Sequence, residues 1–233
     1  MTRIVDRPSP NHGERRGGGP VDMLVLHYTG MTSAEAALDL LCAPAAQVSA
    51  HWLIDEAGTV YRLVDEDRRA WHAGVATWRG AVDVNSRSIG IELANPGHDW
   101  GYRDFAAPQI AALVELCGGI LARHPIPPRN VVAHSDIAPT RKLDPGERFP
   151  WARLAAAGIG AWPDDGAIPV AADAVLPALV RWGYGLDGVP PEILVAAFQR
   201  HFRPTLVDGV ADRQTRARLA ALLGWVAADA ADT

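Results

Sequence analysis

Two short apolar runs, each leading into a histidine, constrain the fold of this chain more than any other feature. The first spans residues 21–26 and leads into His27, and the second spans residues 130–133 and leads into His134. Their apolar and β-branched content predicts buried strands. Both histidines are therefore expected where a strand ends, so that side chains from distant parts of the sequence can meet there.

The segment after His134 is expected to be a constrained loop without regular structure. Pro139 and the Asp-Pro-Gly turn at residues 144–146 disfavour helix and strand. Such a loop can hold His134, Lys142 and Asp144 around one point, and an imidazole and a carboxylate beside a fixed cation suit a metal site. The alternative is a solvated loop in which Asp144 starts a turn and His134 caps a strand.

Five motifs follow one another between residues 20 and 155. They are LVLHYT (24–29), VSAHWLI (48–54), AWHAG (70–74), NSRSIGIEL (85–93) and the segment 134–151. Together they resemble the zinc-dependent N-acetylmuramoyl-L-alanine amidases of the type-2 amidase family, which share a fold with peptidoglycan recognition proteins and phage T7-type lysozyme. The resemblance implies an α/β fold in which a central mixed β-sheet is flanked by helices.

The resemblance also implies one zinc ion per chain, held by His27, His134 and Asp144. Two imidazoles and one carboxylate make the three-ligand set of a catalytic zinc, with the fourth position left for water. Nitrogen ligands favour zinc over harder cations. Phage T7-type relatives carry a cysteine at the third ligand position, whereas Asp144 matches the bacterial amidases.

Glu92 and Lys142 are the expected catalytic side chains. Residues 88–93 alternate as a strand whose apolar face excludes Glu92. Because an unpaired buried carboxylate is costly, Glu92 needs a partner arginine, an exposed edge or a role as general base beside the metal. The resemblance favours the general base, with Lys142 stabilising the tetrahedral oxyanion. The implied reaction is hydrolysis of the amide bond between the lactyl group of N-acetylmuramic acid and L-alanine, in peptidoglycan turnover or recycling.

Six further residues are candidates for substrate binding: His51, Trp71, His72, Trp78, Asn95 and Arg141. Aromatic rings and an imidazole suit stacking on sugars and hydrogen bonding to a peptide. The alternative is that the tryptophans and His72 fill the edge of the core and that His51 only packs. Some family members have a catalytic tyrosine just before this histidine, but Ala50 stands there and excludes that role.

Composition divides the chain into three parts. Residues 1–157 are the expected catalytic domain, which begins with an irregular arm over residues 1–20. Residues 158–172 carry Gly, Pro and Asp without periodicity and predict a linker. Residues 173–233 contain three helical patterns, at residues 175–182, 191–202 and 212–223. They resemble the small three-helix peptidoglycan-binding domain often fused to lytic enzymes. The alternative is a helical extension packed on the catalytic domain.

Charge and hydropathy narrow the range of partners. A net charge of −5 without a Lys/Arg cluster argues against nucleic-acid binding. No apolar run approaches the roughly 20 residues of a membrane span. The expected partners are peptidoglycan or muropeptides, and a monomer is expected. No apolar signal-peptide core follows the two arginines at 15–16, which favours the cytoplasm, with the periplasm or cell envelope as the alternative.

Two other functions are compatible with parts of this pattern. A recognition module of the same fold would bind peptidoglycan without cleaving it, but such modules have lost a metal ligand. The presence of both Asp144 and Glu92 therefore favours an enzyme. A zinc endopeptidase that cuts within the stem peptide needs only a shifted substrate, and the metal site alone does not separate it from an amidase.

Overall fold

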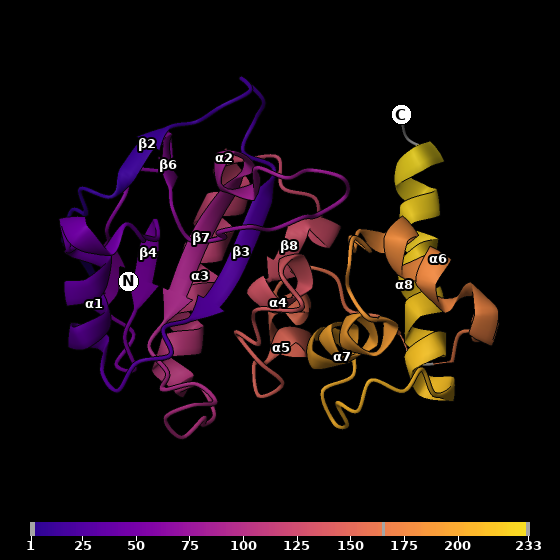
Figure 1. Ribbon diagram of the computed structural model, residues 1–233. Coiled ribbons are helices and arrows are strands. Elements are labelled where there is room, and N and C mark those ends of the chain that lie inside the picture. The colour runs from indigo at the N-terminus through magenta and orange to yellow at the C-terminus, as the bar shows by residue number, and fades with distance from the viewer. Residues whose placement is uncertain (1–2, 165, 232–233) are drawn as a thin grey trace.

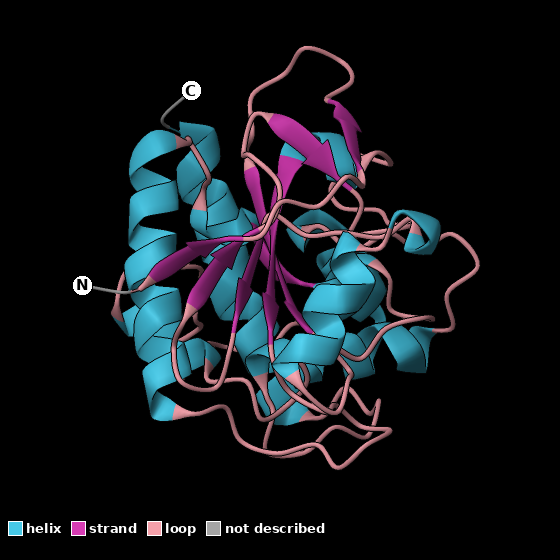
Figure 2. Ribbon diagram, turned by 90° about the vertical axis from the view of Figure 1, so that its left-hand side faces the viewer, coloured by secondary structure: helices cyan, strands magenta, loops and turns pink. Residues whose placement is uncertain are grey.

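A six-stranded mixed sheet forms the centre of the computed structural model, which describes residues 3–164 and 166–231 (Figure 1). In spatial order the strands are β1 (Ile4–Asp6), β5 (Val60–Arg62), β4 (Trp52–Ile54), β7 (Ser88–Leu93), β3 (Met23–Tyr28) and β8 (Val131–Ala133). β3 runs parallel to both of its neighbours, β7 and β8, whereas β4 and β5 form an antiparallel hairpin. Helices lie on both sides of the twisted strands (Figure 2). The predicted mixed sheet flanked by helices is confirmed.

One face of the sheet is covered by α3 (Ala107–Arg123) and α5 (Trp151–Ala156). Alternate side chains of β3 and β7 point to this face. Among them, Leu24, Leu26 and Ile91 are fully buried. The apolar stripe of α3 packs against them. Pro108 stands in the first turn of α3, where its missing amide hydrogen is not needed for a helical hydrogen bond.

The other face of the sheet is covered at two places. Near β4 it is covered by α1 (Ala34–Cys42), whose first turn is capped by the Ser33 hydroxyl accepting from the amide of Ala36 at 3.2 Å. Near β3 and β8 it is covered by the C-terminal helices. These are α6 (Val175–Trp182), α7 (Pro191–Phe202) and α8 (Arg213–Ala231).

The C-terminal helices share one hydrophobic core with the sheet. Met23, Val25 and Val132 of the sheet belong to the same buried cluster as Leu179 and Phe198 of the helices. Residues 158–172, expected to be a linker, begin with two buried side chains: Ala161, 4% exposed, belongs to this cluster, and Ile159, 2% exposed, packs in the core on the α3 side of the sheet. In Figure 1, α7 lies directly beside α4 and α5.

Two local predictions are corrected by the structure. Residues 1–20 were expected to be irregular, but β1 pairs with β5, and β2 (His12–Glu14) pairs with β6 (Arg68–Ala70). The segment after β8 was expected to be an irregular loop, but it begins with the helical turn α4 (His134–Ile137). In both segments, residues far away in the sequence supply hydrogen-bond partners, so the local sequence does not reveal the structure.

Short helical segments complete the described chain: η1 (Pro44–Ala46), α2 (Val84–Arg87), η2 (Pro128–Asn130) and η3 (Ala172–Ala174). Among the described residues, no helix has the length and apolar character needed to cross a membrane.

Candidate metal centre

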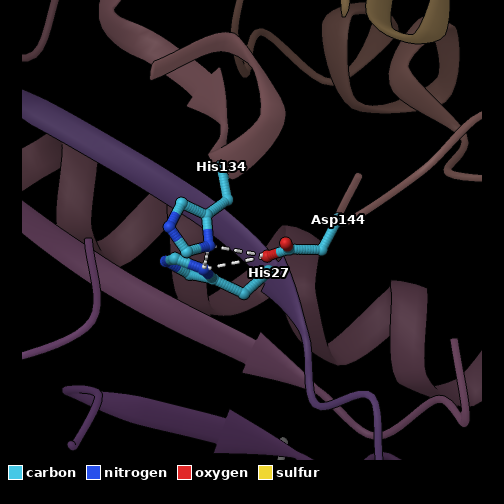
Figure 3. Close-up of side chains that lie close together, drawn as sticks. All are labelled: His27, His134 and Asp144. Atoms are coloured by element: carbon cyan, nitrogen blue, oxygen red, sulfur yellow. Dashed lines mark hydrogen bonds and ion pairs between the residues drawn. The ribbon is translucent and has the colours of Figure 1, made fainter. Parts of the chain in front are cut away.

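Three buried side chains meet where β3 and β8 end (Figure 3). His27 is near the end of β3, His134 directly follows β8, and Asp144 lies in the next loop. The Nδ1 atoms of the two histidines are 2.9 Å apart. Oδ2 of Asp144 lies 3.1 Å from Nδ1 of His27 and 3.0 Å from Nδ1 of His134. One possible ligand atom from each of the three predicted residues therefore converges on one point.

The protonation states of these side chains suit metal binding. Burial, together with the charge of His134, lowers the pKa of His27 to about 4, so its imidazole is neutral at neutral pH. An aspartate carboxyl group has an ordinary pKa of about 3.9, so Asp144 is expected to be ionised at neutral pH. Metals bind neutral imidazole and ionised carboxylate. Two nitrogens and one carboxylate oxygen are a donor set that fits zinc.

The second nitrogen of His27 starts a chain of hydrogen bonds that leads away from the centre. The carbonyl of Val84 can only accept, so the Ser88 hydroxyl donates to it over 2.7 Å. The Ser88 oxygen then accepts from Nε2 of His72 at 3.1 Å, and Nδ1 of His72 is left to accept from Nε2 of His27 at 3.1 Å. This polarity places the His27 proton on Nε2 and its Nδ1 lone pair at the centre.

His134 is oriented in the same sense. Its Nε2 donates to the carbonyl of Ala73 at 3.1 Å, which leaves the Nδ1 lone pair directed at His27 and Asp144. Two lone pairs and a carboxylate oxygen therefore face one another, with no donor among them. Three acceptors at about 3 Å repel one another, and a bound cation would turn that repulsion into attraction.

Gly90 gives His72 its place in this chain. A Cβ atom at Gly90 would lie 2.4 Å from Cγ of the His72 ring. A glycine inside an apolar strand often marks such a close approach. Gly90 alternates with Glu92 on one face of β7, and the packing of His72 explains why this position has no side chain.

Glu92 is beside the metal ligands and has an unpaired carboxylate oxygen. The parallel register of β3 and β7 puts it opposite His27. Its Oε2 is buried and has no hydrogen-bond partner within the described residues. Burial, and then the charge of Asp144, raise the pKa of Glu92 well above its ordinary value, against the opposing effect of Lys142. A carboxyl group in these surroundings suits proton transfer.

A pocket of about 540 Å³ opens beside the centre. Of the five predicted metal-binding and catalytic residues, four line it: Glu92, His134, Lys142 and Asp144. His27 lies beneath them, 1% exposed. The structure thus brings together the five side chains for which the sequence predicted a metal-binding or catalytic role.

Three of the six predicted substrate-binding residues also line this pocket: Trp71, His72 and Arg141. Trp71 is half-buried, while His72 is buried and bonded to His27. The Arg141 guanidinium donates to the carbonyls of Ala73 and Val75 and so is held at the rim of the pocket.

The other three residues, His51, Asn95 and Trp78, do not line this pocket. His51 is fully buried and accepts from the amide of Gly90 at 3.0 Å. The Asn95 side chain donates to the carbonyl of Arg103 at 2.8 Å and accepts from the amide of Gly97 at 3.1 Å. Both side chains hold the scaffold together.

Trp78 belongs to the core between the sheet and the C-terminal helices. Only 1% of it is exposed, and its ring packs edge-on against Tyr184 at 5.2 Å. A Cβ atom at Gly183 would lie 2.7 Å from the same indole. A ring enclosed in this way does not reach a ligand in the pocket.

Sequence reasoning missed several residues that line the pocket. Tyr28, His98 and Asp99 lie on its wall. The Tyr28 hydroxyl is 2.9 Å from Nδ1 of His98, and the His98 ring stacks on Tyr102 at 4.3 Å. The aromatic residues and the histidine in the loop after β7 are the sequence signal that points to this wall of the pocket.

Comparison with known proteins agrees with this geometry. The family model described as N-acetylmuramoyl-L-alanine amidase (Amidase_2) matches residues 17–147. The amidase AmiD of Escherichia coli K12 is 42% identical over 230 residues, covering 87% of this chain and 82% of AmiD. The 1,6-anhydro-N-acetylmuramyl-L-alanine amidase AmpD of Citrobacter freundii is 40% identical over 141 residues, which cover 60% of this chain and 71% of AmpD.

Solved structures give the same result over nearly the whole chain. The complex of E. coli AmiD with the substrate anhydro-N-acetylmuramic acid-L-Ala-D-gamma-Glu-L-Lys has a TM-score of 0.81 and 39% identity, covering 91% of each chain. AmpDh3 of Pseudomonas aeruginosa in complex with anhydromuramic pentapeptide also has a TM-score of 0.81 and 39% identity, covering 90% of this chain and 94% of AmpDh3. This chain belongs to the N-acetylmuramoyl-L-alanine amidase family.

Proposed function

We propose that this chain is a zinc-dependent amidase that cleaves between the lactyl group of N-acetylmuramic or anhydromuramic acid and the L-alanine of the stem peptide. Family membership supplies the type of reaction. The observation that carries the zinc assignment is the cluster of three acceptor atoms, from His27, His134 and Asp144, without a donor among them. A cation bound between the three acceptors would remove their mutual repulsion, and the two nitrogen ligands favour zinc.

Glu92 moves the proton in this proposal. Zinc held by the three ligands would act as a Lewis acid and lower the pKa of a water molecule from 15.7 toward about 7. The unpaired Oε2 of Glu92 takes a proton from the attacking water. The raised pKa of Glu92 helps it to keep that proton until the amine of L-alanine departs and accepts it. One carboxyl group thus serves as base and then as acid.

Lys142 is proposed to stabilise charge on the substrate. It lines the same pocket as Glu92, and its positive charge opposes the rise in the Glu92 pKa, so its field reaches the reacting region. When water adds to the carbonyl carbon, the carbonyl oxygen becomes negative. An ammonium beside that oxygen stabilises its negative charge more than it stabilises the neutral carbonyl.

Several finer assignments rest on the pocket or on sequence resemblance. Trp71 and Arg141 line the pocket, and we propose that they contact the sugar or the peptide. We propose a monomer, in which one chain supplies all three ligands. Peptidoglycan binding by residues 173–233 and the cellular compartment remain predictions from the sequence.

The test measures the metal and the products together. Purified protein should hold about one zinc per chain and release intact stem peptides that begin with L-alanine from anhydro-muropeptides, as identified by mass spectrometry. Asp144→Ala should lose both the metal and the cleavage. Cleavage within the stem peptide would indicate an endopeptidase, and muropeptide binding without any product would indicate a recognition module. Full zinc occupancy in Asp144→Ala would remove that residue as a ligand.

A further inference from the structure

We infer that the C-terminal helices are part of the scaffold of the metal centre, because Tyr184 and His201 position the turn that carries His134. The link is Asp136, which lies in α4 two residues after His134. Tyr184 follows α6, and His201 is in α7. The inference rests on the proposed role of His134 as a ligand, and it assigns to the C-terminal helices a role other than binding the glycan.

Asp136 is a buried carboxylate whose two oxygens are both engaged. Its side chain is 0% exposed. Oδ1 accepts from the Tyr184 hydroxyl at 2.5 Å. Oδ2 accepts from Nδ1 of His201 at 2.6 Å and from the backbone amide of Ala133 at 2.8 Å. Two of its three donors therefore come from the C-terminal helical region, and hydrogen bonds to a charged group in a buried site are stronger than ordinary ones.

The two donors are themselves held in place. The His201 ring stacks on Trp151 of α5 with a centroid distance of 3.7 Å, and only 2% of the side chain is exposed. The Tyr184 ring is 2% exposed and packs against Trp78. Neither donor can follow Asp136 if that side chain moves, so they act as fixed points for α4.

Asp136 in turn determines where two of the three ligands lie. The amide that it accepts belongs to Ala133, the residue before His134. In the same turn, the amide of Ser135 donates to the carbonyl of Asp144 at 2.9 Å. A helix of only four residues has too few internal hydrogen bonds to hold its own shape. The contacts of Asp136 and Ser135 therefore carry the placement of His134 and Asp144.

The test removes one donor without changing the shape of the core. Tyr184→Phe deletes the hydroxyl that Asp136 accepts, and His201→Phe deletes the other donor while keeping an aromatic ring against Trp151. Thr215→Val is the matched control. Its hydroxyl is also buried, but within the described part of the chain it accepts only from Gln199 and Arg203, both in the C-terminal helical region, and not from α4.

Three quantities are measured on full-length protein: zinc affinity by chelator competition, hydrogen exchange of the amides of residues 134–137 in metal-free protein, and the melting temperature. We expect Tyr184→Phe to weaken zinc binding by about 10-fold, the lower end of the range for residues that orient metal ligands. Exchange at residues 134–137 should be faster. Thr215→Val should leave zinc affinity and hydrogen exchange at residues 134–137 unchanged, even if it lowers the melting temperature as much as Tyr184→Phe does. His201→Phe should act like Tyr184→Phe.

Two results would overturn the inference. One is wild-type zinc affinity and wild-type exchange in both Tyr184→Phe and His201→Phe. The other is an equal change in Thr215→Val, which would mean that general loosening of the helices is responsible. If the wild-type protein binds no zinc, the proposed function fails, while exchange in the metal-free protein still decides whether Tyr184 and His201 hold the turn.

Discussion

The proton on Nε2 of His27 is a single atom on which the metal centre depends. It is directed by the chain through His72 and Ser88 to the carbonyl of Val84. If the chain is broken, the imidazole can carry its proton on Nδ1, where it would face the other ligands. Outer partners of metal-bound histidines act in this way in general.

Ser88→Ala tests that chain. The variant removes the acceptor for Nε2 of His72, so we expect zinc affinity to fall by about 10–100-fold with a small change in melting temperature. Ser86→Ala is the control, because its hydroxyl bonds to Asp83 and accepts from the amide of Arg16, with no contact to His72. Chelator competition measures both variants. Equal zinc affinity in the two would show that the chain does not set the tautomer.

Glu92→Gln separates binding from chemistry. The amide has the size of the carboxyl group but does not take up the proton from water. The variant should keep its zinc and its affinity for muropeptide while turnover falls by about 10²–10⁴-fold. Steady-state kinetics and metal analysis on the same preparation check this. Loss of zinc from Glu92→Gln would make Glu92 a ligand and not the base.

At the scale of elements, the strands were predicted well where their pattern is local. The strand at residues 88–93 and the helices at 175–182 and 191–202 have the bounds that the sequence predicted. The strand at β1 was missed because its partner, β5, lies more than 50 residues away. The turn at α4 was missed because a cap from Asp136 and donors from the C-terminal helices stabilise it.

The contrast between local pattern and distant contacts also explains which site residues could be predicted from the sequence. His27, Glu92 and His134 were predicted because a polar side chain in or after an apolar strand needs a reason. His51 shows the same pattern, but the backbone around it satisfies its ring. Local sequence does not distinguish a histidine that faces a pocket from one that faces a buried amide. That information lies in the packing of β4 against β7.

Two buried histidines, His51 and His27, predict that the stability of the fold depends on pH. Burial lowers the pKa of His51 to about 3 and that of His27 to about 4, whereas in the unfolded chain both are near 6.5. Between pH 6.5 and 4 the unfolded chain binds more protons than the folded one. The free energy of unfolding therefore falls as the pH falls, by up to about 1.4 kcal/mol per pH unit for each histidine.

Denaturant unfolding of metal-free protein at pH 7, 6, 5 and 4 measures this slope. Stability from these groups is fully present above pH 6.5 and declines toward pH 4. An unfolding free energy that is constant from pH 7 to pH 4 would contradict the neutral, buried state of these imidazoles.

At the scale of the whole molecule, the shared core makes the C-terminal helices a structural part of the enzyme. Truncation after Ala161 removes α6, α7 and α8 and exposes the buried side chains of Trp78 and Val132. We expect a lower melting temperature and a similar loss of activity on intact sacculi and on soluble anhydro-muropeptides. The full-length chain assayed on both substrates is the reference. An unchanged melting temperature with activity lost on sacculi alone would instead favour a tethering role for these helices.

The order of strands in the sheet has a consequence for the timing of folding during synthesis. β3 is made early but lies between β7 and β8, so that Leu24 pairs with Ile89 on one side and Val131 on the other. At about 5–20 residues per second, β3 is without its second neighbour for at least several seconds after it leaves the ribosome. Until β8 has been made, the β3 edge that later pairs with β8 is open to other chains, even after β7 has paired with the other edge. The nascent chain up to β8 is therefore the stage at which this enzyme depends most on protection from aggregation.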